Sequence, residues 1–298
     1  MVADWMLYRW GGPGFAVTVT AAMAVAHIRG NTSLILVLVA MLVTGGLYAG
    51  LGFTALGNSG LTGLWRQQMT WDVYRDRVWE LHELEMAAEA EQMHKVEARV
   101  TDFAATHGLE HITLAVTGAR LGWVDAASSA RSSKTLGHIE LGHFWFFPEN
   151  AASLPHIVEH ELAHIERNDS ARYALMASIG AAGSVACAGL LSLSYAAVAI
   201  AALFAVRIAV AWWAELTCDT IAVRRCGRHA AVSALTLFLD DRRALPVGAR
   251  LVSMVIALRS HPPLLLRRWW IQHALPGTHA EAPAASRSID RPHHAEGD

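Results

Sequence analysis

A stretch of 42 residues, 173–214, contains a single charged side chain, Arg207. A second stretch, Leu34–Leu56, carries no charge over 23 residues. About 20 consecutive apolar residues form a helix long enough to cross the hydrocarbon core of a bilayer. The longer stretch therefore predicts two membrane helices joined by a tight turn near residues 192–195, and the shorter one predicts a single membrane helix.

A weaker apolar run, Gly14–Ile28, precedes these two. It has two interpretations, because Ala24-Val25-Ala26 resembles the cleavage site of a signal peptide. Against a signal peptide, Arg9 is the only basic residue before the run, and a longer apolar run follows at once. We expect a retained N-terminal membrane hairpin within residues 1–64, with a cleaved signal peptide as the alternative.

Basic residues predict the orientation in the membrane. With four membrane helices, every Lys and Arg except Arg29 and Arg207 falls on one side of the bilayer. Positive charge accumulates on the cytoplasmic side of membrane proteins. The pattern therefore places both termini and the polar segment in the cytoplasm. Basic residues cluster beside the apolar runs at Arg66, Arg75, Arg77, Arg167, Arg172, Arg224, Arg225 and Arg228.

Composition agrees with a membrane protein and argues against a nucleic-acid partner. Hydrophobic residues make up 53% of the chain and charged residues 17%, and the net charge is −2. Nucleic-acid binding needs a basic surface, which this balance does not predict. The three cysteines follow no metal or disulfide spacing and are expected to be reduced thiols.

The polar segment between the membrane runs predicts a mixed domain. Residues 71–106 lack Gly and Pro and are rich in good helix formers, so we expect one long helix that ends at His107-Gly108. Residues 112–116, 121–124 and 136–147 have the composition of strands. Alternate residues of the third share a face, which predicts a half-exposed strand.

A further helix is expected over residues 153–166, with Ser153 as N-cap and Pro155 in the first turn. It carries the sequence His160-Glu161-Leu162-Ala163-His164. The two histidines lie one turn apart on one face, where both imidazoles can bind one Zn²⁺. Glu161 lies beside them, where a carboxylate can accept a proton from a metal-activated water.

A catalytic zinc needs a third protein ligand, and Glu215 is the candidate. It lies 51 residues beyond His164, and the intervening chain is almost entirely the predicted hairpin. A hairpin returns the chain to the side that it left, so Glu215 can meet the two histidines. Asp219, one turn further, can accept the second ring N–H of a ligating histidine. The alternative is that Glu215 and Asp219 are interfacial charges at a helix end.

Other polar residues have less specific interpretations. His156 shares the stripe of His160 and His164, but it lies about 12 Å along the axis from His164, too far for both to bind one ion. We expect it at the cleft or the surface. Arg207 either binds a partner inside the helix bundle or extends to a nearby interface. The remaining candidates are expected to be solvated or packed, namely His82, His94, His138 and His143.

Three separated stretches resemble the HtpX and CAAX-prenyl-protease type of membrane zinc metallopeptidase, a gluzincin family. The first is His160–Ile165 followed by Asn168-Asp169. The second is Glu215–Ala222, where Cys218 stands in place of the usual Ala. The third is Ser260-His261-Pro262-Pro263 followed by Arg267-Arg268.

The resemblance implies His160, His164 and Glu215 as zinc ligands and Glu161 as general base. It also implies that His261 lies near the cleft, helping to bind substrate or to stabilise the oxyanion. The family's Asn-Ala-Phe-Ala type segment is not recognisable here, with Asp125-Ala126-Ala127 at best a remnant.

Together these features predict an α-rich α+β protein: about four membrane helices and a gluzincin-like metallopeptidase domain with a small β-sheet. The domain spans residues 65–272 and includes the hairpin 173–214, and a disordered tail follows over 273–298. One Zn²⁺ per chain is expected to support endoproteolysis of membrane or misfolded proteins at the cytoplasmic face of the cell membrane. An extended peptide is expected to pair with the strand 136–147.

Two other classes of protein fit part of the pattern. One is a regulated membrane sensor that uses a zinc-protease fold to transmit a signal, although the short loop near Arg29 leaves no room for an outer sensor domain. The other is a non-catalytic membrane scaffold, which predicts a lost ligand or base. The sequence makes no prediction of the oligomeric state or the substrate sequence.

Overall fold

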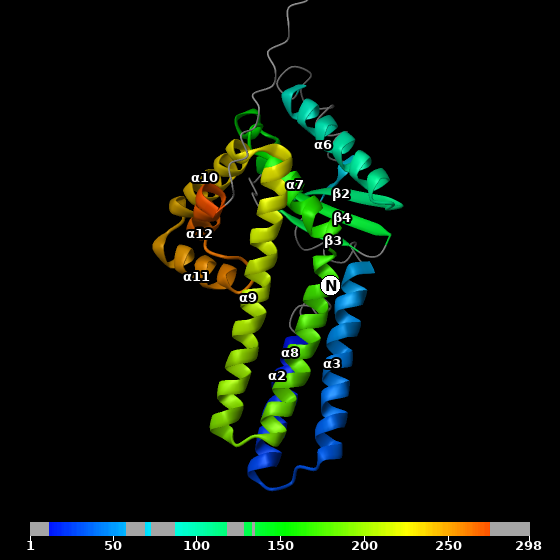
Figure 1. Ribbon diagram of the computed structural model, residues 1–298, viewed down its shortest axis with the longest axis vertical. Coiled ribbons are helices and arrows are strands. Elements are labelled where there is room, and N and C mark those ends of the chain that lie inside the picture. Colours follow the sequence, from blue (N-terminus) through cyan, green and yellow to red (C-terminus); the bar gives the residue numbers. More distant parts are fainter. Residues whose placement is uncertain (1–11, 58–68, 73–86, 118–127, 133–134, 275–298) are drawn as a thin grey trace, which may run out of the picture.

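The computed structural model describes residues 12–57, 69–72, 87–117, 128–132 and 135–274. Four long helices run side by side along the long axis of the molecule, and a small sheet with shorter helices lies at one end of them (Figure 1). The expected strand 121–124, the segment 125–127 and nearly all of the expected tail lie outside the described residues.

The long helices are α2 (Gly12–Ile28), α3 (Leu34–Gly57), α8 (Asp169–Leu190) and α9 (Leu193–Cys226). The predicted hairpin is confirmed as α8 and α9, joined by a turn at residues 191–192. Helix α8 packs against α2, α3 and α9. Small residues permit this close packing, since a Cβ on Gly45 of α3 would lie 3.3 Å from the Cβ of Ala182 on α8.

Two helices of the described chain, α8 and α9, are long and apolar enough to cross a membrane, whereas the apolar parts of α2 and α3 are shorter. Large apolar side chains on α3 and α9 are exposed, among them Leu42 and Val198. An apolar surface of this extent is unfavourable in water and favourable in lipid. Length, composition and exposure thus support association with a membrane.

The sheet contains β1 (Met69–Thr70), β2 (His111–Thr117), β3 (Ser129–Ser132) and β4 (Leu136–Gly142), in the order β1-β2-β4-β3. Strand β4 pairs with β2 in parallel and with β3 antiparallel. The strand expected over 112–116 is confirmed as β2.

Three expectations about residues 136–147 are wrong. The strand ends at Gly142 and gives way to short 3-10 helices, His143–Phe146 and Pro148–Asn150. It is not half-exposed, since every residue from Gly137 to Gly142 is buried. It is also not an edge strand, because β2 and β3 occupy both of its edges and leave no side for an added peptide. Polar His138 and Glu140 tolerate burial because they contact each other at 3.3 Å.

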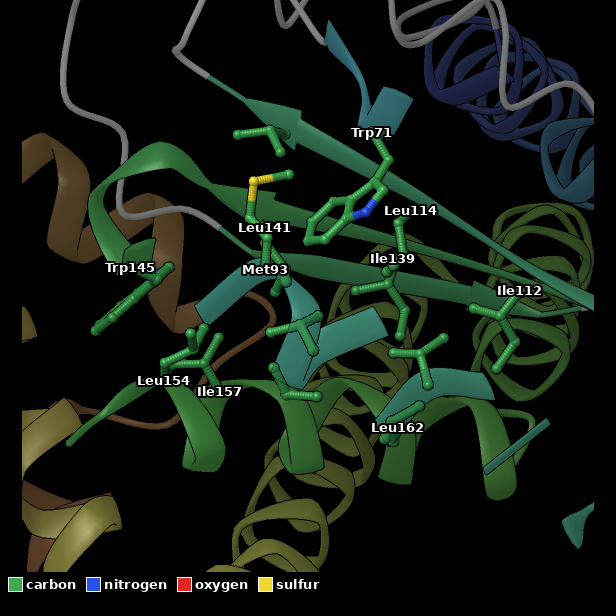
Figure 2. Close-up of a cluster of buried hydrophobic side chains, with 14 of the residues drawn as sticks. Trp71, Met93, Ile112, Leu114, Ile139, Leu141, Trp145, Leu154, Ile157 and Leu162 are labelled. Carbon is green, nitrogen blue, oxygen red and sulfur yellow. The ribbon is translucent and has the colours of Figure 1, made fainter. Parts of the chain in front are cut away.

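Helices α6 (Ala87–Thr106) and α7 (Leu154–Glu166) pack on the sheet through a shared apolar core (Figure 2). Ile112 and Leu114 of β2 and Ile139 and Leu141 of β4 point into it from one face of the sheet. From α6 and α7 come Met93, Val96, Val100, Phe103, Leu154, Ile157 and Leu162. This core fixes the position of α7, the helix with the candidate zinc motif.

The ends of α6 and α7 agree with expectation within the described residues. Helix α6 ends before Gly108, whose φ of +66° suits glycine. Whether the helix extends back to Trp71 depends on residues outside the described part. Ser153 occupies the N-cap of α7 with Pro155 in the first turn. Its hydroxyl bonds to Ser233 at 2.9 Å rather than to an amide of the helix.

Beyond α9 the chain forms α10 (Arg228–Ala244), α11 (Val247–Leu258), α12 (Leu264–Trp269) and a π-helical turn, η5 (Trp270–Ala274). Val223 of α9, Leu235 of α10 and Ile271 of η5 belong to a second apolar cluster. This cluster holds α12 against the last turns of α9 and so determines where Arg267 lies.

Candidate metal centre

Three side chains from two helices converge at one point. His160 Nε2 and His164 Nε2 lie 3.2 Å apart. Glu215 reaches both with its carboxylate, Oε2 at 3.4 Å from His160 Nε2 and Oε1 at 3.4 Å from His164 Nε2. The structure therefore brings together the three residues that the sequence analysis selected as metal ligands.

The spacing of these atoms suits a tetrahedral metal ion. Zinc bonds of about 2.0–2.1 Å in tetrahedral geometry place neighbouring ligand atoms about 3.3 Å apart. The three contacts fall at this separation. Three protein ligands also leave a fourth position, as catalytic zinc sites do.

The hairpin explains how Glu215 reaches the histidines. Helix α9 is 34 residues long, and its apolar part ends at Ala214. Its remaining turns continue as helix, pack against α7 and are buried where Glu215 and Asp219 face it. The turn at residues 191–192 thus brings the chain back to α7 with Glu215 on the face that meets the histidines.

A carboxylate accompanies each histidine. His160 Nδ1 lies 3.0 Å from Asp219 Oδ1, although the two are not aligned as a hydrogen bond. His164 Nδ1 lies 3.0 Å from Asp169 Oδ2 and is hydrogen-bonded to it. Carboxylates in this position orient metal-binding imidazoles and raise their basicity. Asp219 was predicted here, whereas Asp169 entered the sequence analysis only as part of a resemblance.

A backbone feature places Asp169. Asn168 has φ of +51°, the left-handed conformation that Asn tolerates better than most residues. This residue separates α7 from α8 and turns the chain, so the first residue of α8 lies beside the last turn of α7. Arg167 also contacts Asp169, its Nε donating to Oδ2 at 3.0 Å. The Asn-Asp pair is the sequence signal that points to this role.

Arg267 is a component that residue spacing did not reveal. It is buried and donates twice to Asp219, from Nε to Oδ2 at 2.8 Å and from Nη2 to Oδ1 at 2.6 Å. Its Nη1 lies 3.8 Å from Glu215 Oε2. This two-point contact holds the Asp219 carboxylate against His160. The sequence offers only the Arg267-Arg268 pair of the resemblance, which does not say which arginine faces inward.

The charges around the site favour a cation. Burial alone would lower the pKa of the His164 imidazole, but the Asp169 and Glu215 carboxylates raise it well above its usual value. Burial likewise opposes a raised pKa at His160, and Asp219 and Glu215 outweigh it. Both imidazoles thus sit where positive charge is stabilised. A bound metal ion supplies that charge while the imidazoles remain neutral ligands.

Glu161 and His261 lie beside this cluster. Glu161 is buried and accepts a hydrogen bond of 2.7 Å from the Ser128 hydroxyl, directly before β3. His261 Nε2 lies 3.6 Å from Glu215 Oε1, while half of its side chain is exposed. Ser128 was not anticipated, because nothing in its sequence neighbourhood distinguishes it.

His156 and Cys218 lie beside the cluster, but their contacts are to Asp219, Asp169 and the Nδ1 of His164 rather than to the candidate metal-binding atoms. His156 was expected at the cleft or surface, but it is buried, 1% exposed, with Nε2 3.6 Å from Asp219 Oδ1. Cys218 Sγ lies 3.4 Å from His164 Nδ1 and 3.5 Å from Asp169 Oδ2. Burial raises the pKa of its thiol to about 11, so it remains a neutral neighbour.

Comparisons of the chain with protein-family models, curated proteins and solved structures found no match.

Proposed function

We propose that this chain is a membrane zinc metalloendopeptidase. The observation that carries the proposal is the convergence of His160 Nε2, His164 Nε2 and the Glu215 carboxylate from two separate helices. Glu161, adjacent in sequence to one of these histidines, supplies a carboxylate for proton transfer.

The donor set fits zinc. Two imidazoles and one carboxylate are a known ligand combination for catalytic zinc. Glu215 Oε2 is buried and accepts no hydrogen bond from the described residues. An unsatisfied buried carboxylate oxygen is costly, and a bound cation removes that cost.

Zinc, when bound here, supplies a Lewis acid that polarises the peptide carbonyl and lowers the pKa of water to about 7. Glu161 then accepts the proton of the attacking water and delivers it to the nitrogen of the leaving amine. The Ser128 hydroxyl, which donates to Glu161 Oε1, keeps the carboxylate in one orientation. His261, whose Nε2 lies 3.6 Å from Glu215 Oε1 at the exposed edge of the cluster, would donate a hydrogen bond to the substrate carbonyl oxygen.

Strand β3 is the better candidate for binding an extended substrate, now that β4 is known to be central. It is the outer strand on this side of the described sheet. It begins one residue after Ser128, whose hydroxyl contacts Glu161. A peptide added along β3 would run past the general base, with main-chain hydrogen bonds providing affinity.

The membrane part supports a substrate at the bilayer surface. Arg224, Arg225 and Arg228 lie where α9 ends and α10 begins, on the side of the site. The positive-inside rule therefore favours a site facing the cytoplasm. Membrane proteins and misfolded chains are the proposed substrates. A non-catalytic scaffold is disfavoured, since all three candidate zinc ligands and the candidate base are present.

The test is Glu161→Gln, which keeps the size of the side chain and removes its basicity. We expect cleavage of an unfolded reporter protein to fall by about 10²- to 10⁴-fold while zinc remains bound. Glu166→Gln is the matched control, because Glu166 lies on the same helix and pairs with Arg225. A Glu161→Gln variant that cleaves as fast as wild type contradicts the mechanism.

A further inference from the structure

A cavity of about 770 Å³ lies between the long helices, away from the candidate metal centre. Its walls come mainly from α2, α8 and α9, with Tyr48 of α3 and Arg259 beyond α11. Helices α2 and α9 each pack against α8 more extensively than against each other. The space is therefore a cleft between α2 and α9 with α8 as its floor.

The cleft is long and mostly apolar. On α8 it is lined by residues with small side chains that share one face of the helix, namely Ala177, Gly180, Ala181, Ser184 and Ala188. On α9 the lining extends from Leu193 to Arg207, a rise of about 21 Å. One leaflet of a bilayer contributes about 15 Å of hydrocarbon, so an acyl chain fits along this length.

Positive charge gathers at one end of the cleft. Arg207 and Arg259 both line it, and neither forms an ion pair with any residue in the described part of the chain. The Trp212 indole N–H bonds to the carbonyl oxygen of Leu258 at 2.9 Å, which fastens the chain before Arg259 to α9. Arg207, half-buried on α9, lies among apolar helices, where a cation is costly unless an anion accompanies it, and the exposed Arg259 adds a second positive charge to the lining of the cleft.

We propose that this cleft binds one anionic phospholipid from the surrounding bilayer. Its phosphate lies between Arg207 and Arg259, and an acyl chain extends along α8 toward the turn at residues 191–192. Arg207 lies about 12 Å along α9 from Glu215, and Arg259 precedes His261 by two residues. The lipid would thus occupy the bundle directly beneath the candidate metal centre.

Two kinds of variant test the proposed lipid site, one at its arginine pair and one in its apolar part. Arg207→Gln with Arg259→Gln removes the charge, and Arg224→Gln with Arg242→Gln is a control with the same charge change outside the cleft. Gly180→Leu fills the cleft, since a Cβ on Gly180 meets no atom within 4 Å. Gly46→Leu on α3 is its control, because Gly46 has equally open surroundings and does not line the cleft.

The measurement is native mass spectrometry of the full chain taken from vesicles with equal phosphatidylglycerol and phosphatidylcholine. We expect wild type and both controls to retain one phosphatidylglycerol, with about 30-fold preference over phosphatidylcholine from the two arginines. The arginine pair should lose the preference, and Gly180→Leu should lose the bound lipid.

Equal retention of both lipids by wild type overturns the proposal, as does an arginine pair that keeps the preference. If Gly180→Leu fails to fold, the variant Arg207→Gln with Arg259→Gln is sufficient to test the proposal. Because the readout is bound lipid and not cleavage, this proposal and the proposed peptidase activity fail independently.

Discussion

Two buried carboxylates near helix α7 have opposite surroundings. Glu159, on α7 itself, accepts hydrogen bonds from Arg99 and Arg225 on neighbouring helices, so both of its oxygens are satisfied. Glu215 contacts His160 and His164 instead, and its Oε2 accepts no hydrogen bond within the described chain. Both oxygens of Glu159 thus accept hydrogen bonds from arginines, whereas Glu215 Oε2 has Arg267 Nη1 only at 3.8 Å and is left without a hydrogen bond. Burial of a carboxylate therefore does not identify a functional site by itself, and the convergence of Glu215 with two histidines is what distinguishes it from Glu159.

A substitution at Asp219 should weaken the metal centre while leaving the Glu159 contacts intact. Asp219→Asn removes the charge that pairs with Arg267 and contacts His160, so we expect zinc affinity to fall by about 10- to 100-fold. Equilibrium zinc titration measures it. Asp240→Asn is the control, since Asp240 forms an exposed pair with Arg243. Unchanged affinity in Asp219→Asn would mean that Asp219 has only a structural role.

A substitution at Glu159 should lower the stability of the fold and leave zinc binding unchanged. Glu159→Gln weakens contacts to two arginines that are about a third exposed, so we expect a loss of about 1–2 kcal/mol in the free energy of unfolding. Zinc content and cleavage should stay at wild-type levels. Denaturant unfolding measures the change in stability, and elemental analysis measures the zinc content. A loss of zinc in Glu159→Gln would contradict the distinction drawn between Glu159 and Glu215.

The smallest effect is expected at Cys218. Cys218→Ala removes a weak donor to Asp169 and leaves the hydrogen bond from His164 in place. We expect zinc to be retained and cleavage to change by no more than about twofold, since the buried thiol is neutral. Steady-state cleavage rates test this. A large loss would show that the sulfur takes part in metal binding.

Local patterns predicted the helices well and selected the three side chains that the fold brings together. Spacing placed His160 and His164 on one face, capping residues located the start of α7, and a 42-residue apolar stretch predicted the hairpin. The hairpin then made Glu215 a reasonable third ligand despite its distance in sequence. Each of these inferences depends on helix periodicity or on the length of an apolar run, which a single chain reveals.

Long-range arrangement was not predictable in the same way. The polar alternation of β4 looked like an exposed face, but its burial depends on two neighbouring strands and on a contact between His138 and Glu140. Arg267 and Ser128 reach the site through packing of α12 and the start of β3, and neither position has a local signature. The cleft between the long helices arises because α2 and α9 both pack against α8, which no sequence period describes.

Elemental analysis of the purified chain tests the central claim most directly. The account predicts one zinc per chain in wild type and in Glu159→Gln, and loss of zinc in Glu215→Ala, because of these two carboxylates only Glu215 is a proposed zinc ligand. Wild-type protein without zinc, or Glu215→Ala with its zinc intact, would contradict the metal centre proposed for this chain.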